Sequence, residues 1–144
     1  MTTPMGESSE SRLPTLTGMS HISLSVSDCK TSLEWYSEVL GFEVALAAQD
    51  EGPWVRSFCI HPSGLVVGFT QHSESSPFRF QNAGVDHLAF AVARREDLDD
   101  WANRFAAHAV VHSPIEEIEG GALLSFRDPD GIQLEMFYQR RVPA

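Results

Sequence analysis

Apolar and polar side chains alternate strictly over residues 20–27, which is the period of a β-strand with one buried face. Ile22, Leu24 and Val26 form the apolar face, and His21, Ser23 and Ser25 form the polar face. An amphipathic helix is predicted next, with Ser27 or Asp28 as its cap and Gly41 at its end. Extended segments follow at about residues 42–47, 54–60 and 65–71, so the first half of the chain has the pattern βαβββ.

The second half of the chain repeats this order of elements. A strand is predicted at residues 85–93, a helix at about 96–107, and strands near 109–113, 122–127 and 132–139. His21 and His87 are 66 residues apart, as are Trp35 and Trp101. We therefore expect an α+β fold of two βαβββ modules, at about residues 18–72 and 83–139, whose curved mixed sheets surround a concave cup.

The first seventeen residues differ in composition from the rest of the chain. They are rich in Ser, Thr, Pro, Glu and Gly and lack apolar periodicity. This composition predicts a disordered leader, followed by a single domain at residues 18–144.

Strand parity places the candidate metal ligands on the strand faces that point away from the predicted helices. His21 and His87 lie opposite the apolar residues that must cover the helices, and Gln133, Glu135 and Phe137 lie on the corresponding face of the last strand. Burying an isolated carboxylate costs several kcal/mol unless it is paired, protonated or bound to a metal. Two imidazoles and one carboxylate, without a thiolate, suit a divalent metal ion. We expect Fe(II) or Mn(II), with Zn(II), Ni(II) or Co(II) as the other ions, and His21, His87 and Glu135 as ligands.

Other positions on these faces are candidates for contacts with substrate. The position that matches Glu135 in the first module is Gly68, which has no ligating group and leaves room for a substrate. Hairpin parity places Arg56 and Phe58 on the same face, where they can bind an anionic or aromatic part of a substrate. The alternative for Arg56 is a solvated position on the edge of the sheet.

Three stretches of the chain resemble the vicinal oxygen chelate superfamily. They are 126–135 (FRDPDGIQLE), 18–24 (GMSHISL) and 85–90 (VDHLAF). This superfamily includes glyoxalases, extradiol dioxygenases, fosfomycin-modifying enzymes, methylmalonyl-CoA epimerases and metal-free antibiotic-binding proteins. The resemblance implies that His21, His87 and Glu135 bind a divalent metal in a cup formed by paired modules.

The departures from the family pattern bear on the reaction. Gly68 stands where glyoxalases usually have a second Glu or Gln, which weighs against glyoxalase activity. Ser125 stands where extradiol and fosfomycin-modifying enzymes usually have a tyrosine, and Ser125 and Phe137 are expected to contact substrate. His72, fifteen residues before His87, occupies a place comparable to the catalytic non-ligand histidine of extradiol enzymes. The alternative for His72 is a solvated loop histidine.

Charge and composition exclude several classes of partner. The formal net charge of −10 disfavours nucleic acids and anionic membranes. No apolar stretch approaches the roughly 20 residues of a membrane span, and the amino terminus lacks a secretory signal, so a cytoplasmic protein is expected. Cys29 and Cys59 match no metal or redox spacing.

Two functions from different classes remain. The first is a divalent-metal enzyme that chelates neighbouring oxygens of a small substrate. If the ion is Fe(II), the expected reaction is the ring cleavage of extradiol dioxygenases. The second is a metal-free protein that sequesters an antibiotic or another natural product. Exposed sheet edges favour a homodimer, and the sequence leaves open whether one chain or two supply each set of ligands.

Overall fold

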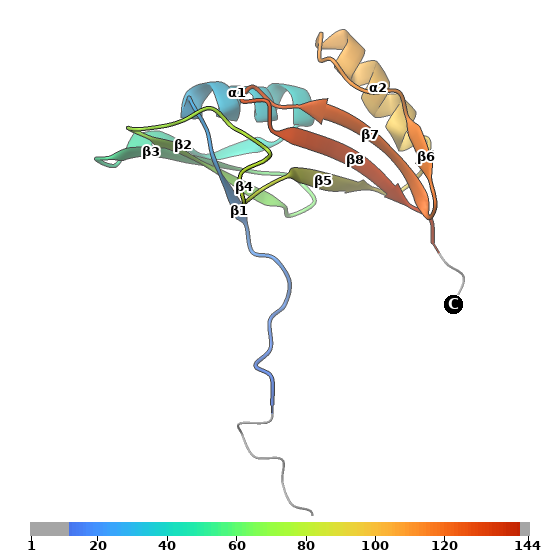
Figure 1. The fold of residues 1–144 in the computed structure, drawn as a ribbon, viewed down its shortest axis with the longest axis horizontal. Coiled ribbons are helices and arrows are strands. Elements are labelled where there is room, and N and C mark those ends of the chain that lie inside the picture. Colours follow the sequence, from blue (N-terminus) through green and yellow to red (C-terminus); the bar gives the residue numbers. More distant parts are fainter. Residues whose placement is uncertain (1–11, 142–144) are drawn as a thin grey trace, which may run out of the picture.

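The computed structural model describes residues 12–141, which form two sheets and two helices (Figure 1). The first module contains β1 (Ile22–Ser25), α1 (Cys29–Leu40), β2 (Glu43–Asp50), β3 (Trp54–Ile60) and β4 (Val66–His72). The second contains β5 (His87–Val92), α2 (Asp97–Ala107), β6 (Glu116–Ile118), β7 (Gly121–Arg127) and β8 (Gln133–Gln139). Both modules are therefore βαβββ, as the alternation of apolar and polar residues predicts.

The two sheets have the same topology. Their strand orders are β1-β4-β3-β2 and β5-β8-β7-β6, and the pairs β1·β4 and β5·β8 are parallel whereas the other pairs are antiparallel. The first strand of each module is consequently an edge strand. In Figure 1 both helices lie on one side of the curved sheets, and the other side of each sheet is not covered by a helix.

The ends of α1 follow from its sequence. The Asp28 side chain accepts a hydrogen bond from the Thr31 amide at 2.8 Å, which satisfies one of the free N–H groups of the first turn. Gly41 adopts a left-handed conformation with φ of 80°, and its N–H closes the last turn on Ser37. The predicted cap and terminator of this helix are both confirmed.

The strand predicted at residues 109–113 is wrong. The third strand of the second module is β6, at Glu116–Ile118, and His112 forms only an isolated bridge with Phe126. The reason is that the chain is still closing α2 here: Ala109 has a positive φ of 54°, and the Val110 amide donates to the Phe105 carbonyl. An N–H used to end a helix is not available for a sheet ladder.

A buried hydrogen bond joins the two modules. Tyr36 of α1 is fully buried, and its hydroxyl donates to Asp128 Oδ2 at 2.9 Å in the turn before β8. Asp128 Oδ1 accepts from the amides of Asp130 and Ile132. Burial raises the pKa of the Asp128 carboxyl above its ordinary value, while the hydrogen bond from Tyr36 acts in the opposite direction.

The variant Tyr36→Phe is expected to lower the free energy of unfolding by about 1–3 kcal/mol, because it leaves a buried carboxylate oxygen without its donor. Tyr138→Phe, which removes a hydroxyl from a half-buried tyrosine of β8, is the control. Urea denaturation of both variants measures the difference. Equal losses in the two variants would contradict a structural role for the Tyr36 hydroxyl.

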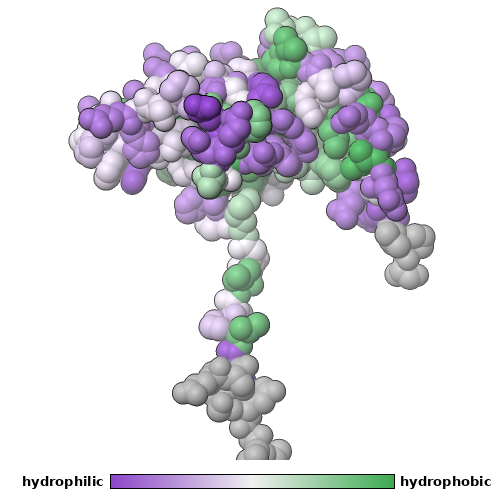
Figure 2. Space-filling view, viewed as in Figure 1, coloured by the Kyte–Doolittle hydropathy of each residue, from purple (hydrophilic) through white to green (hydrophobic). Residues whose placement is uncertain are grey.

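The segment before β1 extends away from the body of the molecule (Figure 2). Residues 12–17 contain neither helix nor strand, and Leu13 and Leu16 are 92% and 85% exposed. Residues 1–11 of the predicted leader and residues 142–144 of the predicted domain lie outside the described residues. Within residues 12–141, none of the helices has the length and apolar character that crossing a membrane requires.

Candidate metal centre

His87 and Glu135 meet on the uncovered face of the second sheet. His87 begins β5, Glu135 lies in the middle of the neighbouring strand β8, and His87 Nε2 is 3.7 Å from Glu135 Oε2. Two donors that each lie about 2.1 Å from one ion can be at most about 4 Å apart. The two side chains are therefore spaced as ligands of a shared cation.

The Glu135 carboxylate is buried without a Lys or Arg partner in the described part of the chain. The residue is 8% exposed, and its described contacts are His87 and the Gln133 amide, whose Nε2 donates to Oε1 at 3.3 Å. Its neighbours on the adjoining strands are small, namely Ala89 on β5 and Ser125 on β7. A carboxylate desolvated in this way costs several kcal/mol unless a cation or a proton compensates it. This environment fits a bound divalent metal.

Asp86 orients the His87 ring. Its Oδ1 lies 2.8 Å from His87 Nδ1, so Nε2 is left to face Glu135. This hydrogen bond is the main reason why the pKa of His87 lies above its usual value, and the charge of Glu135 contributes in the same direction. A carboxylate on the far nitrogen is the usual support of a metal-bound histidine, because it fixes the tautomer and the ring orientation.

His21 has an equivalent arrangement in the first module. Ser20 Oγ lies 2.9 Å from His21 Nδ1, and Ser20 and Asp86 are again 66 residues apart. Each histidine is thus held at Nδ1 by the side chain that precedes it, which leaves Nε2 as the free ligating atom. In the first sheet Gly68 pairs with Ser23 as Glu135 pairs with Ala89, so Gly68 occupies the place of the carboxylate.

The described chain does not bring the three predicted ligands together. No group of three or more His, Cys, Asp or Glu side chains within residues 12–141 is arranged to hold a metal ion. His87 and Glu135 form one half of the expected site, and His21 lies apart from them on the first sheet. We refer to these as the His87 half-site and the His21 half-site.

The His21 half-site lines a concavity of about 690 Å³ that also contains Arg56 and Phe58. The Arg56 guanidinium lies 4.8 Å from the centre of the Trp54 ring and 3.7 Å from a Glu51 oxygen. Phe58 is 37% exposed, which is unusual for a phenylalanine on a central strand. A cation and an open aromatic ring therefore face the same space as His21.

The predicted substrate contacts of the second module lie beside Glu135. Ser125 is paired with Glu135 across β7 and β8, and Phe137 follows two residues later on the same face. Phe137 lines a smaller concavity of about 260 Å³ with Ala89 and Ala91, and this concavity does not include His87 or Glu135. Both residues share the uncovered face of the second sheet with Glu135, and Ser125 lies directly beside it.

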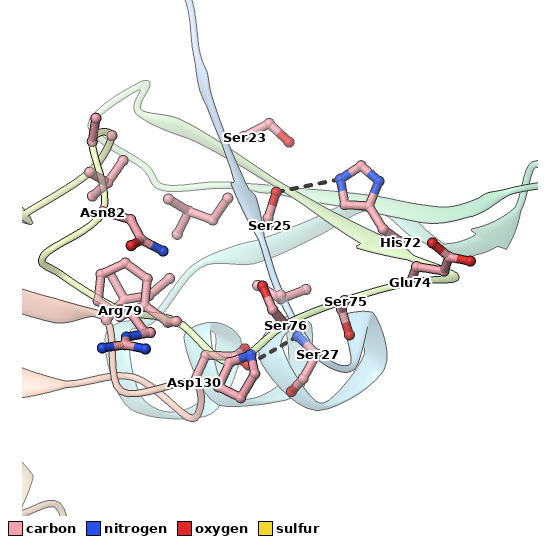
Figure 3. A pocket seen from close by; sticks show the side chains of 18 residues that line it. Ser23, Ser25, Ser27, His72, Glu74, Ser75, Ser76, Arg79, Asn82 and Asp130 are labelled. Atoms are coloured by element: carbon pink, nitrogen blue, oxygen red, sulfur yellow. Dashed lines mark hydrogen bonds between the residues drawn. The ribbon is translucent and has the colours of Figure 1, made fainter.

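His72 lies at the end of β4, on the same face of the sheet as His21. Its Nε2 is 3.4 Å from Ser25 Oγ, and it lines a different cavity from His21, between β1 and the linker of residues 73–86 (Figure 3). His61 contacts Ser63 in a turn. His108 and His112 line a groove beside α1 that Ser125 and Gln133 also line.

Sequence reasoning missed the partners of the two histidines. Asp86 and Ser20 were available signals, because extending the 66-residue repeat by one position toward the amino terminus pairs them. Both are small polar residues placed directly before a candidate ligand, where a side chain can reach the Nδ1 of its neighbour.

Comparison with a family model and with a solved structure points to one superfamily. The family model described as Glyoxalase/Bleomycin resistance protein/Dioxygenase superfamily matches residues 18–136. A glyoxylase/bleomycin resistance protein/dioxygenase domain from Frankia sp. EAN1pec is 33% identical, with 88% of this chain and all of that chain covered and a TM-score of 0.80. A search of the curated proteins returned no match.

A fosfomycin resistance protein, FosX from Listeria monocytogenes, has the same fold. A point mutant of this protein was solved with Mn(II) and 1S,2S-dihydroxypropylphosphonic acid, and its sequence is 22% identical to this chain. The TM-score is 0.64, and 85% of this chain and 90% of that chain are covered. At this identity the likeness establishes the fold alone.

Proposed function

Because the chain belongs to the Glyoxalase/Bleomycin resistance protein/Dioxygenase superfamily, we propose that it is a divalent-metal enzyme that chelates two neighbouring oxygens of a small substrate. The observation that carries this proposal is the buried Glu135 carboxylate, 3.7 Å from the Nε2 of an imidazole whose other nitrogen is held by Asp86. FosX, which shares the fold, is a fosfomycin resistance protein seen with Mn(II). We propose Fe(II) or Mn(II) for this chain, with Zn(II), Ni(II) or Co(II) as the other ions.

The chemistry that the metal supplies when bound is Lewis-acid stabilisation of the negative charge that develops on a substrate oxygen. His87 and Glu135 would hold it, with Gln133 and Asp86 fixing the orientation of their side chains. Gly68, which matches Glu135 in the first module, has no side chain and would leave space for substrate in the concavity that His21 lines.

We further propose that the third ligand, His21, comes from a second copy of the chain. The first strands β1 and β5 are both edge strands, and the uncovered faces of the two sheets carry one half-site each. A homodimer in which the first module of one copy faces the second module of the other would join the half-sites and cover the edges.

The remaining residues are assigned to substrate. Arg56 would attract a negatively charged group, and Phe58 and Phe137 would pack against an apolar or aromatic part. Ser125, opposite Glu135, would donate a hydrogen bond to a substrate oxygen. His72 is on the same sheet face as His21 and is proposed as a proton-transfer group, held by Ser25.

Metal quantification on the full chain, purified without chelator, tests the proposal. We expect about one divalent ion per chain, and turnover of members of a catechol and epoxide panel after anaerobic reconstitution with Fe(II) or Mn(II). A chain that stays metal-free after reconstitution would contradict the enzyme proposal. Tight binding of an antibiotic by that metal-free chain would establish the sequestration function instead.

A further inference from the structure

The segment of residues 12–19, which we call the arm, presents apolar side chains to solvent. Leu13, Leu16 and Met19 are 92%, 85% and 68% exposed, and every residue from 12 to 20 is exposed. In Figures 1 and 2 the arm projects away from both sheets. Large apolar side chains that are gathered on one exposed segment are typical of a surface that a partner covers.

The backbone of the arm allows its two leucines to bind together. Residues 12–19 contain neither helix nor strand, and Pro14 disfavours the helical conformation for Leu13. In an extended chain of the polyproline II type, side chains three positions apart lie on the same edge, about 9 Å from each other. Leu13 and Leu16 have this spacing, so both can enter one groove.

An apolar cleft of about 430 Å³ lies between β5 and the first module. We call it the module cleft. Its large apolar side chains come from both modules, namely Leu40, Phe42, Leu65, Phe90, Trp101 and Met136. Among the described residues that line the cleft, none is Asp, Glu, Lys or Arg. Residues 13–19 (LPTLTGM) are likewise uncharged, so the arm has the chemistry that this cleft accepts.

The module cleft follows the free edge of β5. Four consecutive residues of this strand, 89–92, line it. Successive side chains of a strand point to opposite faces, so a cavity that all four line reaches the edge of the strand. In the described chain β5 pairs with β8 alone and is the edge strand of its sheet. An extended segment can bind beside such an edge and place its side chains in the adjoining pockets.

We propose that the arm of one copy binds in the module cleft of a second copy, with Leu13 and Leu16 as its anchors. The arm projects away from both sheets of its own chain, so it leaves its own cleft open (Figure 1). Because the arm directly precedes β1, this exchange brings β1 of one copy near β5 of the other. These are the two edges that the proposed homodimer covers.

Chemical crosslinking tests the exchange on the full, metal-free chain. Cys29 and Cys59 are fully buried, so an introduced surface cysteine supplies the reactive thiol. One chain carries Thr17→Cys at the end of the arm, and a differently tagged chain carries Ser63→Cys at an exposed position of the cleft. The two chains are co-expressed and treated with a short bismaleimide. A crosslinked product that carries both tags is expected.

The matched control for this crosslink places the second cysteine outside the cleft. Glu119→Cys replaces Ser63→Cys, because Glu119 is an exposed residue in the turn between β6 and β7, at the opposite edge of the second sheet from β5. With Thr17→Cys on the other chain, this pair is expected to give only background crosslinking.

The two leucines are tested by the strength of the dimer. Leu13→Ser and Leu16→Ser are each expected to raise the dissociation constant of the dimer about tenfold or more, because each removes a leucine that the symmetric dimer buries twice. Sedimentation equilibrium measures the constant, and an unchanged circular dichroism spectrum shows that the variants fold. Thr15→Ser, which alters the arm between the leucines, is expected to leave the constant unchanged.

Each of the other outcomes overturns the exchange. A monomeric wild-type chain would do so, as would a Thr17→Cys and Ser63→Cys pair that crosslinks no more than the control. Crosslinking confined to a chain that carries both cysteines would show that the arm covers the cleft of its own chain.

The arm and the metal site fail in different ways. A dimer that lacks this crosslink would retain the proposed homodimer and the metal-enzyme function. A crosslinked dimer that takes up no metal would retain the arm exchange and overturn the metal enzyme.

Discussion

The variant Glu135→Gln is expected to lower the affinity of the chain for a divalent metal by about 100-fold or more, because it removes an anionic ligand while keeping the shape of the side chain. Isothermal titration with Mn(II), or metal content after dialysis, measures the loss. Glu116→Gln is the matched control, since it makes the same change on an exposed strand of the same sheet. The control is expected to bind metal as the wild type does.

A second measurement on the same variant separates a ligand from a structural residue. In the metal-free chain, the Glu135 carboxylate is desolvated and has no Lys or Arg partner among the described ion pairs. Replacing it by a neutral amide is therefore expected to leave the free energy of unfolding unchanged or to raise it by about 1 kcal/mol. A marked loss of stability in the metal-free variant, with metal affinity retained, would show that Glu135 supports the sheet and does not bind metal.

Much of the fold follows from short-range patterns in the sequence. The alternation around His21 and His87 predicts which residues face the helices, and the buried core residues Leu24 and Leu134 lie where this parity places them. The cap at Asp28 and the glycine at residue 41 define α1 because both act on backbone groups within one turn. These features depend only on neighbouring residues, which the sequence displays directly.

The start of the third strand of the second module could not be predicted, because the polar and apolar pattern near residue 109 is compatible with either a strand or a helix end. The deciding feature is the left-handed Ala109, a conformation that non-glycine residues seldom adopt and that the pattern does not encode. The backbone is directed back onto α2 at this point, so His112 forms only an isolated bridge with Phe126 and the regular ladder with β7 starts at Glu116.

The relative placement of the two modules is also beyond short-range patterns. Parity places His21, His87 and Glu135 on equivalent faces, but whether these faces meet depends on how the modules pack. In this chain Tyr36 binds Asp128, and Arg104 donates to the carbonyl of Val39 at 2.6 Å, so the helix-bearing sides of the modules are in contact. The described chain therefore does not bring the three candidate ligands together, and the sequence leaves open the number of chains that supply each site.

The proposed homodimer, in which each metal site combines half-sites of two chains, predicts a specific pattern of complementation between two variants. His21→Ala removes the ligand of one half-site, and Glu135→Gln removes a ligand of the other, so homodimers of either variant should lack any complete site. In a mixed dimer, the intact first module of the Glu135→Gln chain would face the intact second module of the His21→Ala chain. One of its two sites would then have every ligand, and the other would lack two.

Random mixing of equal amounts of the two chains should therefore restore about a quarter of the wild-type metal-binding sites, because half of the dimers are mixed and each has one complete site of two. The variants are co-expressed with different tags, mixed dimers are isolated through both tags, and metal content is measured beside each homodimer. Isolated mixed dimers should hold half of the wild-type metal content. If they hold none while both variants remain dimeric, the half-sites are not joined across the dimer, and His21 would have no part in the metal centre, because the described chain does not place it with His87 and Glu135.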